Sequence, residues 1–107
     1  MDLSYYLYRQ KKLDDEIMRN CGEEKDLLSK KVLALQTEVA EFANATRCFK
    51  YWSKKAPEPR ERQLDEWVDI FHFLLSIANH QGYTSDDIEQ AYDKKNQINA
   101  NRQKAGY

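Results

Sequence analysis

The sequence predicts an all-α protein: a bundle of four to five helices, built by a single domain of residues 1–107 and completed by dimerisation. Only 3 glycines and 2 prolines occur in the chain, which leaves little turn chemistry for a β-sheet. Apolar residues recur at helical spacing from end to end. A domain of this size buries a small fraction of its surface, and for that reason we expect a homodimer.

Two apolar stripes predict the first two helices. The first helix is expected from about Leu3 to Met18 and ends before Gly22, because glycine commonly follows the last helical turn. The second is expected from about Lys25 to Thr46. The stripes comprise Leu3, Tyr6, Leu7, Leu13 and Ile17 in the first helix and Leu28, Val32, Leu35, Val39 and Phe42 in the second.

A basic and aromatic loop separates the second helix from the third. Residues 49–60 include Pro57 and Pro59, which forbid a continuing helix. The third helix is expected from about Glu61 to His80 and is apolar on most sides. A helix of that kind either lies at the centre of a domain or meets a second subunit.

The fourth helix is expected to follow Thr84-Ser-Asp-Asp87 and to continue to about Arg102. Threonine is a common N-cap residue, and acidic residues in a first turn interact favourably with the helix dipole. The chain thus reads as four helices with one long connection.

Composition excludes several classes of function. The net charge is −1 with 33% charged residues, so we expect no nucleic-acid partner, which would call for a basic excess. No apolar run is long enough to span a membrane, so we expect no membrane partner. Cys21 and Cys48 show no metal or redox spacing, and without a secretory segment they are expected to be reduced thiols of a cytoplasmic protein.

Four carboxylates are the most informative residues of the chain. Glu38 and Glu41 are spaced i, i+3, as are Glu66 and Asp69, so each pair shares one face of its helix. Both faces are apolar, where a carboxylate is costly unless its charge is compensated. Two such pairs facing each other across a helical hairpin form an oxygen-rich site for Mg²⁺, with Mn²⁺ as an alternative. The alternative reading is a set of surface glutamates paired with lysines.

Two other groups of polar residues are candidates for contacts with a nucleotide. Gln10 lies on the apolar stripe of the first helix, where its amide can read the edge of a nucleobase. The alternative is a buried glutamine satisfied by backbone or water. Lys95, Asn99 and Arg102 share a face of the fourth helix and are candidates for a phosphate clamp. The alternative is a solvated helix end.

Aromatic and histidine side chains offer further candidates. Trp52, with Phe49, can stack on a base, and Lys50 or Lys54 would then lie near its phosphates; core aromatics at a helix end are the alternative. His72 follows Asp69 by one turn, a spacing that also occurs in carboxylate-bridged di-iron bundles. Those bundles need Glu-x-x-His on two helices, so a base-contacting or core histidine is the better interpretation.

In combination, these residues resemble the all-α, dimeric-type dUTPases, within the wider superfamily of MazG-like nucleoside triphosphate pyrophosphohydrolases. The resemblance covers most of the chain. It is carried by residues 38–52 (EVAEFANATRCFKYW), residues 65–76 (DEWVDIFHFLLS), the tail from Lys95 to Tyr107, and Gln10 with Leu13-Asp14. Each motif alone is weak, but four in the right order are fairly specific.

The resemblance implies cleavage of a nucleoside triphosphate between the α- and β-phosphates, with dUTP as the substrate of the dUTPase branch. It assigns Mg²⁺ to Glu38, Glu41, Glu66 and Asp69. It assigns the phosphates to Lys95, Asn99, Arg102 and Tyr107, and the base and sugar to Gln10, Trp52 and His72, with Lys50 nearby. Glu41, together with Glu38, is the candidate for activating the attacking water.

Two other interpretations stay open at this point. The first is a MazG-like or dCTPase-like pyrophosphohydrolase with another base preference. The second is a non-catalytic helical dimer that binds a partner protein through its apolar third helix.

Overall fold

The computed structural model describes residues 2–106 and contains four helices in this range, with no strand among the described residues. They are α1 (Leu3–Cys21), α2 (Leu27–Thr46), α3 (Arg60–Gln81) and α4 (Ser85–Lys104). The all-α prediction is confirmed, and each observed helix overlaps the one expected from the apolar stripes. The observed ends of the helices differ from the expected ends by only a few residues.

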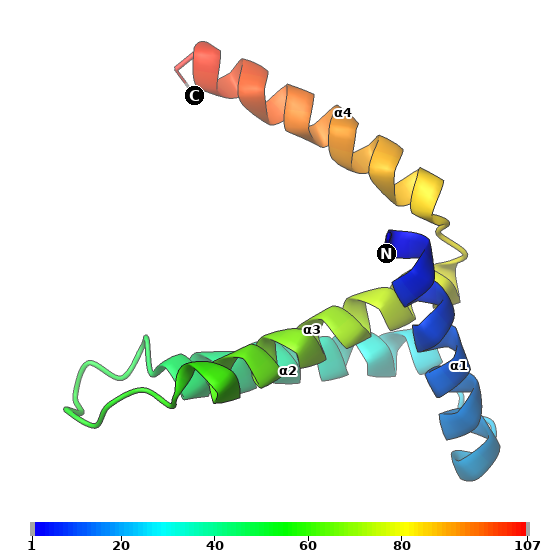
Figure 1. Ribbon diagram of the computed structural model, residues 1–107, viewed down its shortest axis with the longest axis horizontal. Coiled ribbons are helices and arrows are strands. Elements are labelled where there is room, and N and C mark those ends of the chain that lie inside the picture. Colours follow the sequence, from blue (N-terminus) through cyan, green and yellow to red (C-terminus); the bar gives the residue numbers. More distant parts are fainter. Residues whose placement is uncertain (1, 107) are drawn as a thin grey trace.

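The helices pack as a hairpin with two additions (Figure 1). α2 and α3 lie antiparallel along their length, and α1 crosses the end of this hairpin that is remote from the connecting loop. α4 leaves that same end and extends away from the hairpin, with its first turns against α1. The arrangement brings residues of α1, α2 and α3 together and leaves most of α4 outside.

A small core holds α1 on the hairpin. Leu7 of α1 packs with Leu75 and Ala78 of α3, all less than 10% exposed, and Ile88 at the start of α4 packs against them. The side-chain amide of Asn79 donates to the backbone carbonyl of Leu7 over 2.8 Å. These contacts fix the position of α1 against α3, which matters for the site between them.

The side chain of Arg47 makes two hydrogen bonds to the loop between α2 and α3. Arg47 ends α2 in the left-handed conformation, with φ of 59°, which is unfavourable for a residue with a β-carbon. Its guanidinium offsets that cost by donating to the carbonyl of Lys55 and to the hydroxyl of Ser53 at 3.0 and 2.8 Å. The prolines predicted to break the helix are in this loop, as expected.

α4 begins with a complete capping box. The Thr84 hydroxyl accepts from the backbone N–H of Asp87, and the Asp87 carboxylate accepts from the backbone N–H of Thr84. These hydrogen bonds hold the pKa of Asp87 below its ordinary value. The capping box defines where α4 begins.

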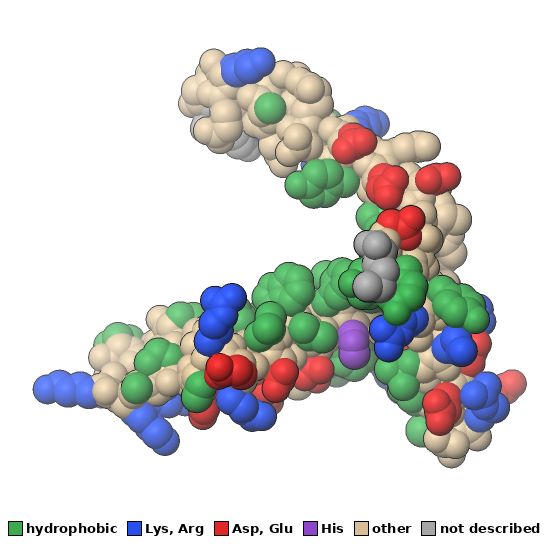
Figure 2. Space-filling view, viewed as in Figure 1, with side chains coloured by type: hydrophobic (Ala, Val, Ile, Leu, Met, Phe, Trp, Pro, Cys, Tyr) green, Lys and Arg blue, Asp and Glu red, His purple; other side chains and the backbone are tan. Residues whose placement is uncertain are grey.

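The chain is far from spherical. Its radius of gyration is 17.2 Å, whereas a compact domain of this length has about 13 Å. α4 buries none of its residues, and large apolar side chains of the other helices, among them Leu64, Trp67 and Leu74, are about half exposed. Figure 2 shows hydrophobic side chains gathered on the side of the hairpin that faces α4. No helix within residues 2–106 has the length and apolar character that crossing a membrane requires.

Candidate functional site

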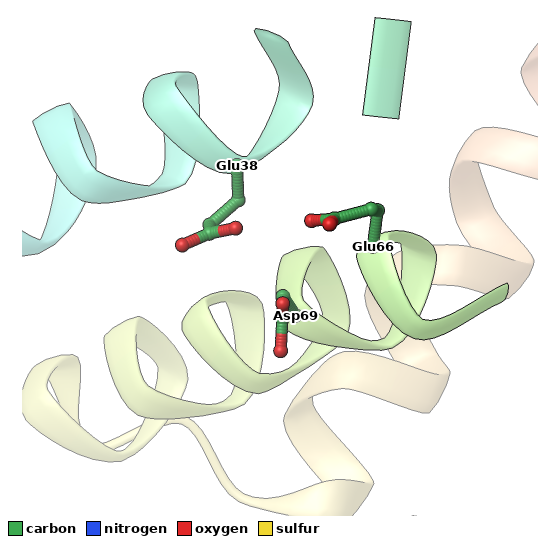
Figure 3. A group of neighbouring side chains, drawn as sticks. All are labelled: Glu38, Glu66 and Asp69. Carbon is green, nitrogen blue, oxygen red and sulfur yellow. The ribbon is translucent and has the colours of Figure 1, made fainter. Parts of the chain in front are cut away.

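Three of the four predicted carboxylates converge between α2 and α3. Glu38 points from α2 toward Glu66 and Asp69 of α3, and one oxygen of each lies within 4.8 Å of the others (Figure 3). The i, i+3 spacing places Glu66 and Asp69 on the same side of α3. The antiparallel packing of the hairpin then sets Glu38 opposite both of them.

The charges of this cluster are not compensated by the protein. None of the ion pairs within residues 2–106 involves the three carboxylates. Burial, followed by the charges of Asp69 and Glu66, raises the pKa of Glu38 above its ordinary value. The alternative interpretation, surface glutamates paired with lysines, therefore does not apply to Glu38, Glu66 and Asp69.

Glu41 lies beside the cluster and not within it. It is exposed, and it is absent from the three carboxylates whose oxygens approach within 4.8 Å. Its charge nevertheless contributes, after burial and the charges of Asp69 and Glu66, to raising the pKa of Glu38. Its role as a metal ligand or base stays a prediction.

The raised pKa of Glu38 predicts how pH affects stability without metal. A group with a raised carboxyl pKa stabilises the fold fully below its unfolded pKa, and this contribution is lost as the pH rises through the folded pKa. In EDTA, between about pH 4 and pH 7, the melting temperature of the wild type should therefore fall relative to that of Glu38→Gln. Thermal unfolding followed by circular dichroism measures the difference.

Asp65→Asn is the matched control for this experiment. Asp65 is exposed on α3 next to Glu66 and does not belong to the cluster. Its variant should keep the wild-type dependence on pH. Parallel pH profiles for the wild type and Glu38→Gln would contradict a raised pKa of Glu38 in the folded protein.

An open aromatic cleft of about 590 Å³ lies between α1 and α3. The rings of Trp67 and Phe71 are stacked with centroids 5.9 Å apart, and Tyr6 meets Phe71 edge-on at the same distance. Volume and lining are typical of a small-molecule site. Glu66 of the acidic cluster and Trp67 of the cleft are consecutive residues of α3, so the two sites occupy adjoining sides of the same helical turn.

Gln10 is buried at the wall of this cleft, with 7% of its surface exposed. Its side-chain nitrogen donates to Asp14 at 2.9 Å. The two interpretations of Gln10, a satisfied buried amide and a reader of a base, are thus compatible, because one end of the amide is satisfied and the residue still lines the cleft.

His72 also lines the cleft and is exposed. It is not part of the group of converging acids, so the di-iron interpretation receives no support from its position. His72 and Gln10, which the sequence analysis assigned to the base, are brought together at one cleft from two helices.

Trp52 and Lys50 lie elsewhere. Both belong to the loop at the end of the hairpin opposite α1 (Figure 1). Trp52 is 64% exposed, with its ring edge-on to Tyr51 and Phe49, and the Lys50 ammonium lies 5.6 Å from the centre of the Phe49 ring. Neither residue lines the aromatic cleft, so their contact with a base stays a prediction.

The predicted phosphate clamp is on α4. Lys95, Asn99 and Arg102 are exposed there, and within residues 2–106 α4 does not pack along α2 or along the acidic part of α3. One chain therefore does not bring these residues to the carboxylates. Tyr107, the fourth predicted phosphate contact, lies outside the described residues.

Sequence reasoning missed the aromatic wall of the cleft. Trp67 and Phe71 belong to the segment 65–76 that carries the family resemblance and Tyr6 to the apolar stripe of the first helix, but none of them was assigned to a ligand site. The available signal was the i, i+4 spacing of two aromatic residues next to Glu66. An apolar helix face looks the same in sequence whether it forms a core, an interface or a ligand cleft.

Comparison with known proteins identifies the class of enzyme to which this all-α chain belongs, and its family. A family model described as dUTPase matches two overlapping segments, residues 2–84 and 77–107. The chain is a hydrolase acting on phosphoric anhydride bonds of nucleoside triphosphates. It belongs to the all-α dUTPase family, which confirms the resemblance found in its motifs.

A relative whose name specifies a cytosine nucleotide, and not a uracil nucleotide, also matches. The dCTP pyrophosphatase of Enterobacteria phage T4 is 28% identical over 120 aligned positions, which cover 95% of this chain and 70% of that protein. This match agrees with a nucleoside triphosphate pyrophosphohydrolase.

Proposed function

We propose that the protein hydrolyses dUTP to dUMP and pyrophosphate, with Mg²⁺ bound by Glu38, Glu66 and Asp69 and by Glu41 beside them. The observation that carries this proposal is the convergence of three uncompensated carboxylates next to an aromatic cleft on the same helix. Membership of the dUTPase family supports uracil as the base.

The donor set fits a hard divalent cation. Carboxylate oxygens are the ligands that Mg²⁺ and Mn²⁺ prefer, and these lie within 4.8 Å of one another without a basic partner among residues 2–106. When bound, Mg²⁺ would neutralise charge on the phosphate oxygens and supply a more acidic water. Glu41, exposed beside the cluster, would accept the proton of the attacking water, with Glu38 as the neighbouring carboxylate.

The substrate would lie along α3. A base in the aromatic cleft, near Gln10 and His72, would leave the sugar and phosphates toward the acidic cluster. Stacking on Trp67 supplies affinity for any base. Selection among bases requires directional hydrogen bonds, for which Gln10 is the suitably placed side chain.

The phosphate clamp points to a homodimer. Lys95, Asn99 and Arg102 are remote from the carboxylates of their own chain, α4 buries none of its residues, and the chain is more extended than a compact domain. In the proposed dimer, α4 of one chain covers the site of the other and brings these residues, together with Tyr107, to the phosphates. The exposed thiols of Cys21 and Cys48 suit a reducing cytoplasm.

A second candidate substrate is dCTP. The phage T4 relative is named for this activity, and an amide side chain can pair with either pyrimidine, depending on which end of the amide faces the base. Both nucleotides share the proposed metal site and the proposed bond cleavage.

Coupled binding tests the enzyme proposal against a non-catalytic helical dimer. A non-hydrolysable α,β-imido analogue of dUTP should raise the melting temperature only in the presence of Mg²⁺, because ligand that binds the folded state alone stabilises it. Differential scanning fluorimetry measures the four combinations of analogue and metal. Asp69→Asn should lose the shift, and Asp65→Asn should keep it. No shift in the wild type would favour the protein-binding interpretation.

A further inference from the structure

A partly buried polar network lies beneath the aromatic cleft, and of its members the site described above uses only Gln10. Asp14 of α1 is its centre. One carboxylate oxygen, Oδ1, accepts from the side-chain nitrogen of Gln10 at 2.9 Å. The other, Oδ2, accepts from the hydroxyl of Ser76 at 2.6 Å and lies 3.9 Å from the ammonium of Lys31. The network thus joins α1, α2 and α3 at one carboxylate.

The network fixes which end of the Gln10 amide faces Asp14. An ionised carboxylate offers acceptors only, so the amide must turn its nitrogen toward it. The amide oxygen of Gln10 has no hydrogen-bond partner within residues 2–106. Every side-chain nitrogen or oxygen that is buried in this range does have such a partner. That oxygen therefore reaches the surface, and the surface that Gln10 lines is the cleft.

The contacts of Asp14 also keep the carboxylate itself in place. Ser76 is 3% exposed, and the side chains of Lys31 and Asp14 are 15% and 20% exposed. Lys31 additionally donates to the backbone carbonyl of Ser76 at 3.5 Å. Side chains held from three helices cannot rotate independently, so the acceptor in the cleft has a defined position.

We propose that Asp14, held by Ser76 and Lys31, is a positioning residue that locks the Gln10 amide with its oxygen toward the base and thereby selects uracil over cytosine. The inference rests on the proposed function. Uracil carries a proton on N3, which the Gln10 oxygen can accept, whereas N3 of cytosine is itself an acceptor. A site built for one hydrogen-bonding pattern discriminates strongly against the reversed one.

Asp14→Asn should reverse the amide. Lysine offers donors and no acceptor, so the oxygen of the introduced asparagine will face Lys31 and its nitrogen will face Gln10. The Gln10 amide must then present its oxygen to that nitrogen. Its own nitrogen turns to the cleft, where it can donate to N3 of cytosine and not to N3 of uracil.

The test compares kcat/KM for dUTP with kcat/KM for dCTP in each variant. Asp14→Asn should lower this ratio by about tenfold or more. Adding Gln10→Glu to Asp14→Asn should restore the ratio, because both oxygens of the introduced glutamate are acceptors and one again faces the cleft. A merely structural role of Asp14 would not be rescued by a second change. Asp15→Asn is the matched control, since Asp15 pairs with Lys11 on the exposed side of α1.

Ser76→Ala gives an independent route if Asp14→Asn does not fold. It removes one of the contacts that hold Asp14, and the ratio should fall in the same direction by a smaller factor. An active Asp14→Asn or Ser76→Ala enzyme with the wild-type ratio would overturn the positioning role and leave the proposed function intact. A wild type that hydrolyses neither dUTP nor dCTP would overturn the proposed function itself, and base selection by Gln10 with it.

Discussion

Asp69→Asn should reduce kcat by about 10²–10³-fold while leaving the helix content unchanged, and Glu66→Gln should do the same. Each change keeps the shape of the side chain and removes one negative charge from a cluster whose oxygens lie within 4.8 Å. In the proposed mechanism, charge neutralisation at the phosphates depends on that cluster, so losing one ligand should cost several kcal/mol of transition-state stabilisation. Steady-state rates of pyrophosphate release, with circular dichroism on the same samples, provide the measurement.

Asp65→Asn serves again as the control for charge on α3. Its carboxylate is exposed and does not belong to the acidic cluster, so its kcat should stay close to that of the wild type. Retention of more than a tenth of wild-type kcat by Asp69→Asn, at saturating Mg²⁺, would remove this residue from the proposed metal site.

Mixing two inactive variants should recover about a quarter of the wild-type activity if the site is shared in a two-fold dimer. The variants are Glu66→Gln, which damages the acidic cluster, and Lys95→Ala, which damages the phosphate clamp. In a mixed dimer, one site combines the intact hairpin of one chain with the intact α4 of the other, while the second site carries both changes. Unfolding the two variants in urea and refolding them in one mixture allows subunits to exchange.

A mixture of Glu66→Gln and Asp69→Asn is the control for complementation. Both changes lie on α3 of the same hairpin, so no exchange of subunits creates an intact site. This mixture should stay inactive. If sedimentation shows a dimer of about twice the 12.7 kDa chain and the first mixture also stays inactive, then α4 does not act on the partner's site.

Helices and carboxylates were predictable because both depend on short-range spacing. Stripes at i, i+3 and i+4 locate helices, and an acidic pair on an apolar stripe is unusual enough to mark a site. The prolines at positions 57 and 59 fixed the turn of the hairpin, so Glu38 was expected opposite Glu66 and Asp69. The structure places these three as expected.

The network below the cleft depends on tertiary structure and was not predictable. Ser76 is separated from Asp14 by 62 positions, and its hydroxyl reaches the carboxylate only because α1 crosses α3 at Leu75. In sequence, Asp14 belongs to a motif of the family resemblance, but nothing in the motif indicates that it contacts Ser76 and Lys31. Its contact with Gln10 also needs a particular rotamer of each side chain, which spacing alone does not define.

The direction of α4 also could not be predicted from the sequence. Its capping residues fix where the helix begins, but its weak apolar stripe does not determine which surface it covers. Lys95 and Arg102 are predicted to bind the phosphates, whereas in one chain α4 extends away from the carboxylates (Figure 1). In the proposed dimer, the α4 helix of a second chain would bring these residues to the carboxylates.

The most direct test of the proposed activity is product analysis with dUTP, dCTP, dTTP, dATP, dGTP and UTP, each with and without Mg²⁺. We expect Mg²⁺-dependent conversion of dUTP to dUMP and pyrophosphate, with slower turnover of dCTP and little of the others. Release of inorganic phosphate with formation of dUDP would contradict cleavage between the α- and β-phosphates. Absence of turnover for every nucleotide in the presence of Mg²⁺ would contradict the proposed activity as a whole.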